Sequence, residues 1–235
     1  TNVAPLANTT YNVSVSYAST GCATPASTSL VTVTECPSTL SLTAFLQGFY
    51  YDINTMRANI YDLSISTDPT ETDTVTVNLW SPDNLSSPTP DYTALSVVHT
   101  DGTVTPVTFP AGLGGAPYYI AVKHRNHLET WSKLPVVFKP AVSYDFTTAQ
   151  AQAYDDGVNL PMASVAGGKF AFYGGDVNQD GTVDGSDMSI VDNDNATFAF
   201  GYNASDVSGD GATDGSDILI IDNNQPLFLF YARPY

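Results

Sequence analysis

Two short acidic stretches repeat along this sequence at a fixed distance. "GDVNQDGTVDGSD" begins at residue 175 and "SDVSGDGATDGSD" begins at residue 205. Each stretch sets carboxylate, amide or hydroxyl side chains at alternate positions around an Asp-Gly pair. A hard cation such as calcium takes about six to eight oxygen ligands, and a tight loop with this spacing can supply them. Without a cation the crowded carboxylates would repel one another, so the pattern predicts two calcium sites rather than two solvated acidic turns.

The ligand positions follow from numbering each loop from its first Asp. Gly181 and Gly211 stand at position 6, where a sharp turn is needed. Position 7 contributes a backbone carbonyl, and we expect Asp187 and Asp217 at position 12 to bind with both oxygens from the start of a short helix. The predicted ligands are Asp176, Asn178, Asp180, Thr182, Asp184 and Asp187 in the first loop, and Asp206, Ser208, Asp210, Ala212, Asp214 and Asp217 in the second.

Paired loops of this kind, with Asp at position 12 and no leading helix, resemble dockerin type I repeats. The resemblance implies two calcium ions and, in some members, docking to a cohesin partner. Cohesin-binding dockerins usually carry Ser-Thr before the last ligand and a basic pair further along the helix. This chain departs from both features, with Gly185-Ser186 and Gly215-Ser216 at the first place and Asp192-Asn193 and Asp222-Asn223 at the second. We therefore expect the calcium ions but no cohesin partner.

The similarity between the two repeats continues past the loops. Phe198 and Phe200 recur as Phe228 and Phe230. We expect the repeats to act as a structural clamp that packs on the preceding domain through these four rings.

Composition narrows the possible functions. The chain has 235 residues, with 7 Lys and Arg against 24 Asp and Glu, for a formal net charge of −17. This balance argues against binding a nucleic-acid backbone or an anionic membrane surface. Abundant Thr, Ser, Val, Tyr and Asn, without long Leu/Glu/Lys runs, predict a mainly β protein.

The elements that would position the loops belong to a β-sandwich over residues 38–145, of the immunoglobulin or fibronectin kind. In "TVTVNLW", Val75, Val77 and Leu79 alternate with polar residues, as in a half-buried strand. "HTDGTV" predicts a hairpin turn, and "LSLTAFLQGFYY" and "KLPVVF" are further candidate strands. Residues 146–172 are a predicted connector with a short helix capped by Thr147 or Thr148, and residues 173–235 form the double calcium-loop unit.

Residues 1–36 resemble the last two strands of a fibronectin type III domain, with Tyr11 at the tyrosine-corner position. A lone hairpin is marginal in water, so its apolar face must be covered. Three explanations stay open: the chain is cut from a longer protein, the hairpin packs on the next domain, or a neighbouring copy supplies strands. Cys22 and Cys36 suit one disulfide or two buried thiols, and an extracellular composition favours the disulfide.

Other residues that could do chemistry gather in "KHRNHLETW". We expect His127 and Glu129 to share a strand face with Arg125 and Trp131, as a metal, sugar or catalytic site or as an ordinary strand end. Four of the basic residues, Lys123, Arg125, Lys133 and Lys139, form either a patch that meets another copy or a local ion-pair network. The sequence carries no Gly-x-Ser-x-Gly, His-Glu-x-x-His or P-loop motif.

Longer stretches such as "FLQGFYYDINTM" and "YDFTTAQAQAYDDGVN" resemble a module that ends large secreted bacterial surface proteins and enzymes. We therefore expect a secreted, non-enzymatic, calcium-stabilised structural or adhesive protein, assembled head to tail into a fibre by strand complementation. Its partners would be other copies or neighbouring β domains, and glycans. The alternative is a carbohydrate-binding or anchoring module, with Trp80, Trp131 or Tyr residues in an exposed row.

Overall fold

The structure is a computed structural model that describes residues 9–13, 27–31, 37–158 and 160–235. The chain divides into two compact units, Thr1–Cys36 and Pro37–Tyr235, and each is described by itself. In the first unit, β1 (Thr9–Val13) pairs antiparallel with β2 (Ser27–Val31) as a two-stranded sheet. Cys22 and Cys36 lie outside the described residues, and so does the side chain of Tyr11; the disulfide and the tyrosine corner stay predictions.

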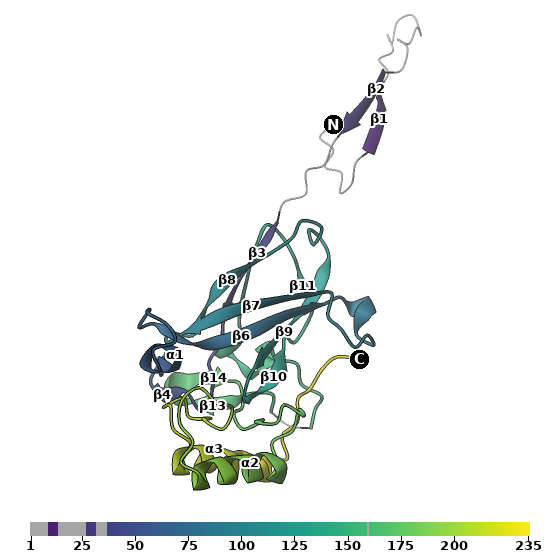
Figure 1. The fold of residues 1–235 in the computed structure, drawn as a ribbon. Helices are drawn as coiled ribbons and strands as arrows, with labels where there is room; N and C mark the ends of the chain where they lie inside the picture. The colour runs from purple at the N-terminus through teal and green to yellow at the C-terminus, as the bar shows by residue number, and fades with distance from the viewer. Residues whose placement is uncertain (1–8, 14–26, 32–36, 159) are drawn as a thin grey trace, which may run out of the picture. The chain divides into compact units, whose positions relative to one another are not determined.

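The second unit is built on an eight-stranded mixed sheet. Seven of its strands follow the order β10-β9-β6-β7-β8-β3-β12, and β11 also pairs with β9. The bounds are β3 Ser38–Thr43, β6 Glu71–Trp80, β7 Tyr92–His99, β8 Thr103–Phe109, β9 Pro117–His124, β10 His127–Trp131, β11 Val136–Val137 and β12 Ala141–Asp145. β12 runs parallel to β3, and the other pairs are antiparallel. The sheet curls around its core (Figure 1), so the prediction of a mainly β, sandwich-like fold is confirmed.

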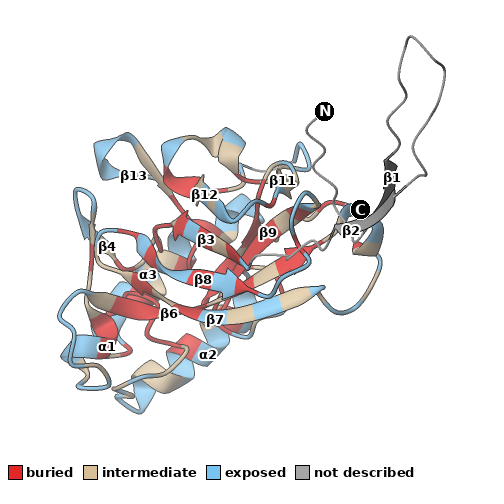
Figure 2. Cartoon of the chain, turned by 90° about the horizontal axis from the view of Figure 1, so that it is seen from above, coloured by how far each residue is buried: buried red, intermediate tan, exposed pale blue. Residues whose placement is uncertain are grey.

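The apolar face of the curled sheet forms the main core. Val75, Val77 and Leu79 on β6 are buried, while the residues between them are half-buried, as the period-2 pattern predicts. Aromatic rings fill the interior, and Phe109 and Tyr118 both pack edge-to-face on Phe138. Figure 2 shows the buried residues concentrated along β3, β6, β8 and β9.

The remaining elements are short. They are β4 Tyr50–Asp52, β5 Thr55–Met56, α1 Asn59–Asp62, β13 Ala163–Val165, β14 Lys169–Ala171, α2 Gly185–Ala196 and α3 Gly215–Asn224, with 3-10 helices η1 Pro82–Asn84, η2 Phe146–Thr148, η3 Gln150–Gln152, η4 Ala166–Gly168 and η5 Gln225–Leu227. Helices α2 and α3 pack against each other at one end of the unit (Figure 1). The Asp-Gly hairpin between β7 and β8 is confirmed, with Gly102 at φ 84° donating to the carbonyl of His99 at 2.8 Å.

Three predicted elements differ from the structure. The single strand expected over residues 40–51 is interrupted after Thr43 by a turn, in which Phe49 and Tyr50 donate to the carbonyl of Leu46. This turn packs against the second acidic loop, so a long-range contact overrides the local β propensity. The strand expected over residues 133–138 shrinks to β11, because Pro135 has no amide hydrogen to pair.

The predicted connector helix is also different. Residues 146–152 form two 3-10 turns instead of one helix. The cap is Asp145 rather than Thr147 or Thr148, since its Oδ1 accepts from the Thr147 amide at 2.8 Å.

Candidate metal centre

Both acidic loops have the same backbone path. At position 6, Gly181 and Gly211 have φ of 89° and 87°, in the left-handed region that glycine enters without strain. At position 4, Gln179 and Gly209 have positive φ of 59° and 71°. The loops therefore turn twice within a few residues, which brings position 1 back toward position 6.

Each loop ends in a helix whose first turn is closed by the loop's own carboxylates. Asp184 and Asp214 are the N-caps of α2 and α3, and each accepts from a serine amide two residues later at 2.7 Å. Asp187 and Asp217 complete a capping box by accepting from the cap amide. Position 12 thus lies at the start of a helix.

The carboxylates at positions 1 and 12 are buried in both loops. Asp187 Oδ1 accepts from the amides of Val177 and Asn178 at 2.7 and 3.0 Å, and Asp217 Oδ1 accepts from the amide of Ser208 at 2.7 Å. Burial raises the pKa of Asp176 to about 7 and that of Asp217 to about 6. It also raises the pKa of Asp187 and of Asp206. Buried acids of this kind need a counter-charge to stay ionised.

The side chains at positions 5 and 9 of the first loop are exposed. Asp180 accepts from the hydroxyl of Thr182 at 2.7 Å and Asp184 from that of Ser186 at 2.7 Å, and these bonds lower the pKa of each carboxyl. Among the described residues, His, Cys, Asp and Glu side chains do not come together in groups of three or more that could hold a metal ion. The loop carboxylates accept hydrogen bonds from neighbouring amides and hydroxyls.

The donor set nevertheless fits calcium. Every predicted ligand offers oxygen, which is the atom that a hard cation prefers. In the second loop, the Oγ of Ser208 at position 3 is buried without a hydrogen-bond partner of normal geometry. The Ser208 hydroxyl lies near Asp217 and lowers the pKa of that carboxyl slightly, but burial outweighs it and the pKa stays raised. A buried oxygen without a normal hydrogen bond beside the buried Asp217 carboxylate is an arrangement that a bound cation would satisfy.

The segment that follows each helix forms backbone hydrogen bonds with the acidic loop of the other repeat. Val183 after position 7 of the first loop donates to Leu229, and Thr213 of the second loop donates to Ala199. Because side chains alternate along an extended segment, Leu229 points inward while its neighbours point out. The expectation that the four Phe rings pack on the sandwich is wrong: Phe198, Phe200, Phe228 and Phe230 are exposed by 84, 85, 82 and 40%.

The second loop is fastened to the sandwich by a buried polar network. Arg125, in the turn between β9 and β10, donates from Nε to Asp73 Oδ2 at 3.0 Å, and its Nη2 lies 3.7 Å from Asp206 Oδ2. Asn59 also donates to Asp206 Oδ2, at 2.9 Å. The amide of Asn126 donates to the carbonyls of Ala204 and Asp206. The sequence predicts that the basic residues form either a patch that meets another copy or a local ion-pair network, and Arg125 takes part in a local ion-pair network.

The structure does not bring His127 and Glu129 into one reactive site. His127 is fully buried beside His124, their Nδ1 atoms 2.9 Å apart, and burial holds the pKa of His127 well below its usual range. Glu129 accepts instead from the indole of Trp131 at 2.6 Å, and burial raises its pKa. The expected shared face is wrong for Arg125, which lies in the turn rather than on their strand, while Glu129 and Trp131 on β10 do contact each other.

The two tryptophans, which the carbohydrate-binding alternative requires to be exposed, are buried. Trp80 and Trp131 are buried, with ring centroids 5.5 Å apart, and the guanidinium of Arg233 lies 5.6 Å from each ring. Their expected role as a planar sugar-binding row is therefore wrong.

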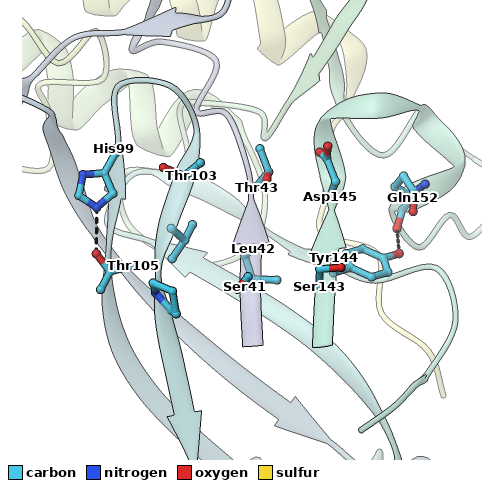
Figure 3. A pocket seen from close by; sticks show the side chains of 12 residues that line it. Ser41, Leu42, Thr43, His99, Thr103, Thr105, Ser143, Tyr144, Asp145 and Gln152 are labelled. Carbon is cyan, nitrogen blue, oxygen red and sulfur yellow. Dashed lines mark hydrogen bonds between the residues drawn. The ribbon is translucent and has the colours of Figure 1, made fainter. Parts of the chain in front are cut away.

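A pocket of about 730 Å³, lined by both polar and apolar side chains, opens beside β3, β8 and β12 (Figure 3). His99 and Thr105 stand at one side and Asp145 and Tyr144 at the other, with Thr43 between them. His99 bonds to the hydroxyls of Thr70 and Thr105 at 3.1 and 2.9 Å, and Asp145 accepts from Thr147. The lining is rich in hydroxyl groups, which suits a polar ligand better than a nucleophilic reaction.

The chain is thus a mainly β protein with a curled mixed sheet and a duplicated acidic loop-helix unit. No protein-family model matches it, and no curated protein matches it. Among solved structures, it is similar to a chain in the crystal structure of a type II cohesin–X-dockerin complex from Acetivibrio cellulolyticus, an N-terminal interface mutant. The identity is 15% and the TM-score 0.42, over 80% of this chain and 95% of that chain. At these values the comparison assigns no family.

None of the helices in the described part of the chain has the length and apolar character that a membrane crossing needs.

Proposed function

We propose that residues 37–235 form a calcium-stabilised, non-catalytic module of a secreted bacterial surface protein, with a structural or adhesive role. One observation carries the calcium part: the two loops each bury a position-1 and a position-12 carboxylate, and the buried Ser208 Oγ beside Asp217 has no hydrogen bond of normal geometry. Burying ionised carboxylates without a counter-charge costs several kcal/mol, on the order of the stability of a whole domain.

Calcium would be held by the predicted ligands of both loops. The bound ion supplies positive charge where the chain has little, since residues 170–232 contain no Lys or Arg. The chain's own contribution is to hold the loop backbone in place, through the capping boxes of α2 and α3 and the backbone bonds between the repeats. The role of calcium is then to fix the shape of the unit and to link its stability to the cation supply.

Calcium removal tests this proposal directly. We expect two calcium ions per chain by isothermal titration calorimetry, and a fall in Tm on the order of 10 °C when a chelator removes them. Asp187→Asn and Asp217→Asn should each abolish one site. The matched controls are Asp192→Asn and Asp222→Asn, which remove the same charge from exposed helix positions and should keep both sites. An unchanged Tm after chelation, with no calcium bound, contradicts the proposal.

We further propose that the module assembles head to tail through its first unit. β1 and β2 form a two-stranded sheet within a unit of their own, and two strands alone are marginally stable in water. A strand from a neighbouring copy would complete the sheet, and a contact that does not close on itself makes a filament. Electron microscopy of the full chain at high concentration, with and without calcium, tests this. Filaments are expected with calcium, and monomers alone would contradict assembly by this route.

The carbohydrate-binding alternative depends on the pocket in Figure 3, because the tryptophans are buried. Hydroxyl groups of Thr and Ser line the pocket beside His99, Asp145 and Gln152. These groups both donate and accept hydrogen bonds, as sugar hydroxyls require. Binding on a glycan array that is lost in Asp145→Ala would favour this function, and silence of the array would exclude the glycans tested.

A further inference from the structure

We propose that Arg125 is a built-in counter-ion of the second loop, so that the two loops bind calcium unequally, the first tightly and the second weakly. This inference rests on the proposed calcium function. It concerns residues outside both loops, which the loop pattern does not include.

The position-1 carboxylates differ in their surroundings. Asp206 Oδ2 receives the amide of Asn59 at 2.9 Å and has the guanidinium Nη2 of Arg125 at 3.7 Å. Asp176 has no ion pair within 4.0 Å in the described part of the chain and accepts from the Gly181 amide at 3.4 Å. The position-1 carboxylate of the second loop therefore has a guanidinium within 4.0 Å, whereas that of the first loop shares a cavity with Lys123 but forms no ion pair with it within 4.0 Å.

Arg125 is held where it is. Asp73 accepts from its Nε at 3.0 Å, and Asp73 is itself fixed by the hydroxyl of Tyr202 at 2.7 Å and by His124 at 3.2 Å. The guanidinium also lies 4.6 Å from the ring of Tyr202 and 5.6 Å from that of Phe49. A side chain with this many partners cannot swing away when a cation arrives.

Two nitrogens of the guanidinium remain without hydrogen bonds. Arg125 Nη1 and Nη2 are buried and have no partner of normal geometry, so their charge is incompletely screened. A divalent cation at the second loop would meet this positive charge beside its position-1 ligand. Like charges at such separations in a partly buried setting weaken binding by roughly tenfold or more.

The contact between Arg125 and Asp206 also affects the calcium-free chain. Arg125, Asn59 and the Asn126 amide keep the second loop attached to the sandwich without a cation. The first loop has Lys123 nearby, which lines a cavity with Asp176 and Asp180 but forms no ion pair with them within 4.0 Å. On gradual calcium removal the second site should lose its ion first. The first loop should keep its ion longer, but once the ion has left it should become more disordered than the second loop.

Calorimetric titration of the full chain with calcium measures the two sites separately. Asp217→Asn leaves only the first site, and Asp187→Asn leaves only the second. We expect the second site to bind roughly tenfold more weakly than the first. Equal affinities in these two variants would overturn the inference even if Arg125 variants fail to fold. Failure of the wild type to bind calcium at all would instead remove the proposed function.

Arg125→Gln tests the cause. It should tighten the second site by roughly tenfold and leave the first unchanged. Lys123→Gln is the matched control: it removes one positive charge from the same part of the chain, two residues earlier, and should leave the second site unchanged. Circular dichroism of both variants checks their fold. No tightening at the second site in a folded Arg125→Gln protein would overturn the role of Arg125.

Discussion

Two exposed phenylalanines show strain at single residues. Phe198 and Phe228 have φ of 55° and 52°, at the ends of α2 and of η5, where helices usually place glycine. A bulky residue in this left-handed region costs about 1–2 kcal/mol. Both repeats thus place a phenylalanine at this left-handed position.

Replacing Phe198 by glycine should therefore stabilise the protein. We expect Phe198→Gly to raise the free energy of unfolding by about 1 kcal/mol in urea titrations with saturating calcium. Phe200 is equally exposed and lacks the positive φ, so Phe200→Gly serves as the control and should lower stability or leave it unchanged. A loss of stability in Phe198→Gly equal to that in Phe200→Gly would show that the strain is absent.

The buried loop acids predict how the calcium-free protein responds to pH. Asp176 has a folded pKa of about 7 and Asp217 of about 6, above their values in an unfolded chain. At these two groups the folded state binds more protons, so their contribution to stability is fully present below the pKa of an unfolded Asp and is lost as pH rises through about 6 and 7.

Thermal melts in chelator should thus show a lower Tm at pH 7.5 than at pH 5. The free energy of unfolding should fall by about 2 kcal/mol over the same range. With calcium bound the carboxylates are ionised, and this decline should disappear. A calcium-free Tm that rises from pH 5 to pH 7.5 would contradict the burial of these acids.

At the scale of elements, a close approach joins the sheet to the second loop. A Cβ on Gly48 would lie 2.0 Å from the carbonyl oxygen of Val207, so only glycine fits the turn after β3. Side chains add to the contact: Gln47 and Asn224 exchange hydrogen bonds, and the Asn224 amide donates to the carbonyl of Gly174 at 2.7 Å. The loop-helix unit is thereby packed on the sheet without the phenylalanines.

Gly48→Ala should force the turn after β3 away from the second acidic loop. We expect a loss of about 2–3 kcal/mol in the free energy of unfolding, because the clash is with backbone that cannot move alone. Gly114→Ala is the control, since nothing lies within 4 Å of its Cβ position and its φ is not in the left-handed region. Equal stability of the two variants would argue against the close approach.

At the scale of the whole molecule, residues 37–235 hold both the sheet core and the core of the acidic loop-helix unit. The two clusters are joined where β13 pairs with β14: Ala171 on β14 belongs to the sheet cluster, and its partner Ala163 on β13 belongs to the loop-side cluster. Paired strands of this kind should make sheet and loops unfold together.

Removing residues 1–36 should leave that behaviour intact. We expect the shortened chain to keep the Tm of the second unit within about 2 °C and its calcium response, while losing any filaments. Differential scanning calorimetry and electron microscopy provide the two readouts. A large drop in Tm would mean that the first unit stabilises the second.

The parts of this protein that could be predicted from sequence are those set by neighbours in the chain. Gly181 at the tight turn, Asp187 at the start of α2 and the alternation along β6 depend on residues within about a dozen positions, so their pattern is visible in the sequence. The ligand spacing belongs to the same class, and the calcium itself stays a prediction.

Only the tertiary structure decided which charges and rings meet. Arg125 and Asp73 are 52 residues apart, and Asn59 and Asp206 are 147 apart. No local signal announced Asp73 or Asn59, because neither belongs to a motif. The burial of the tryptophans and the exposure of Phe198 likewise depend on which face of a segment the rest of the chain covers, and that is settled only when distant segments pack together.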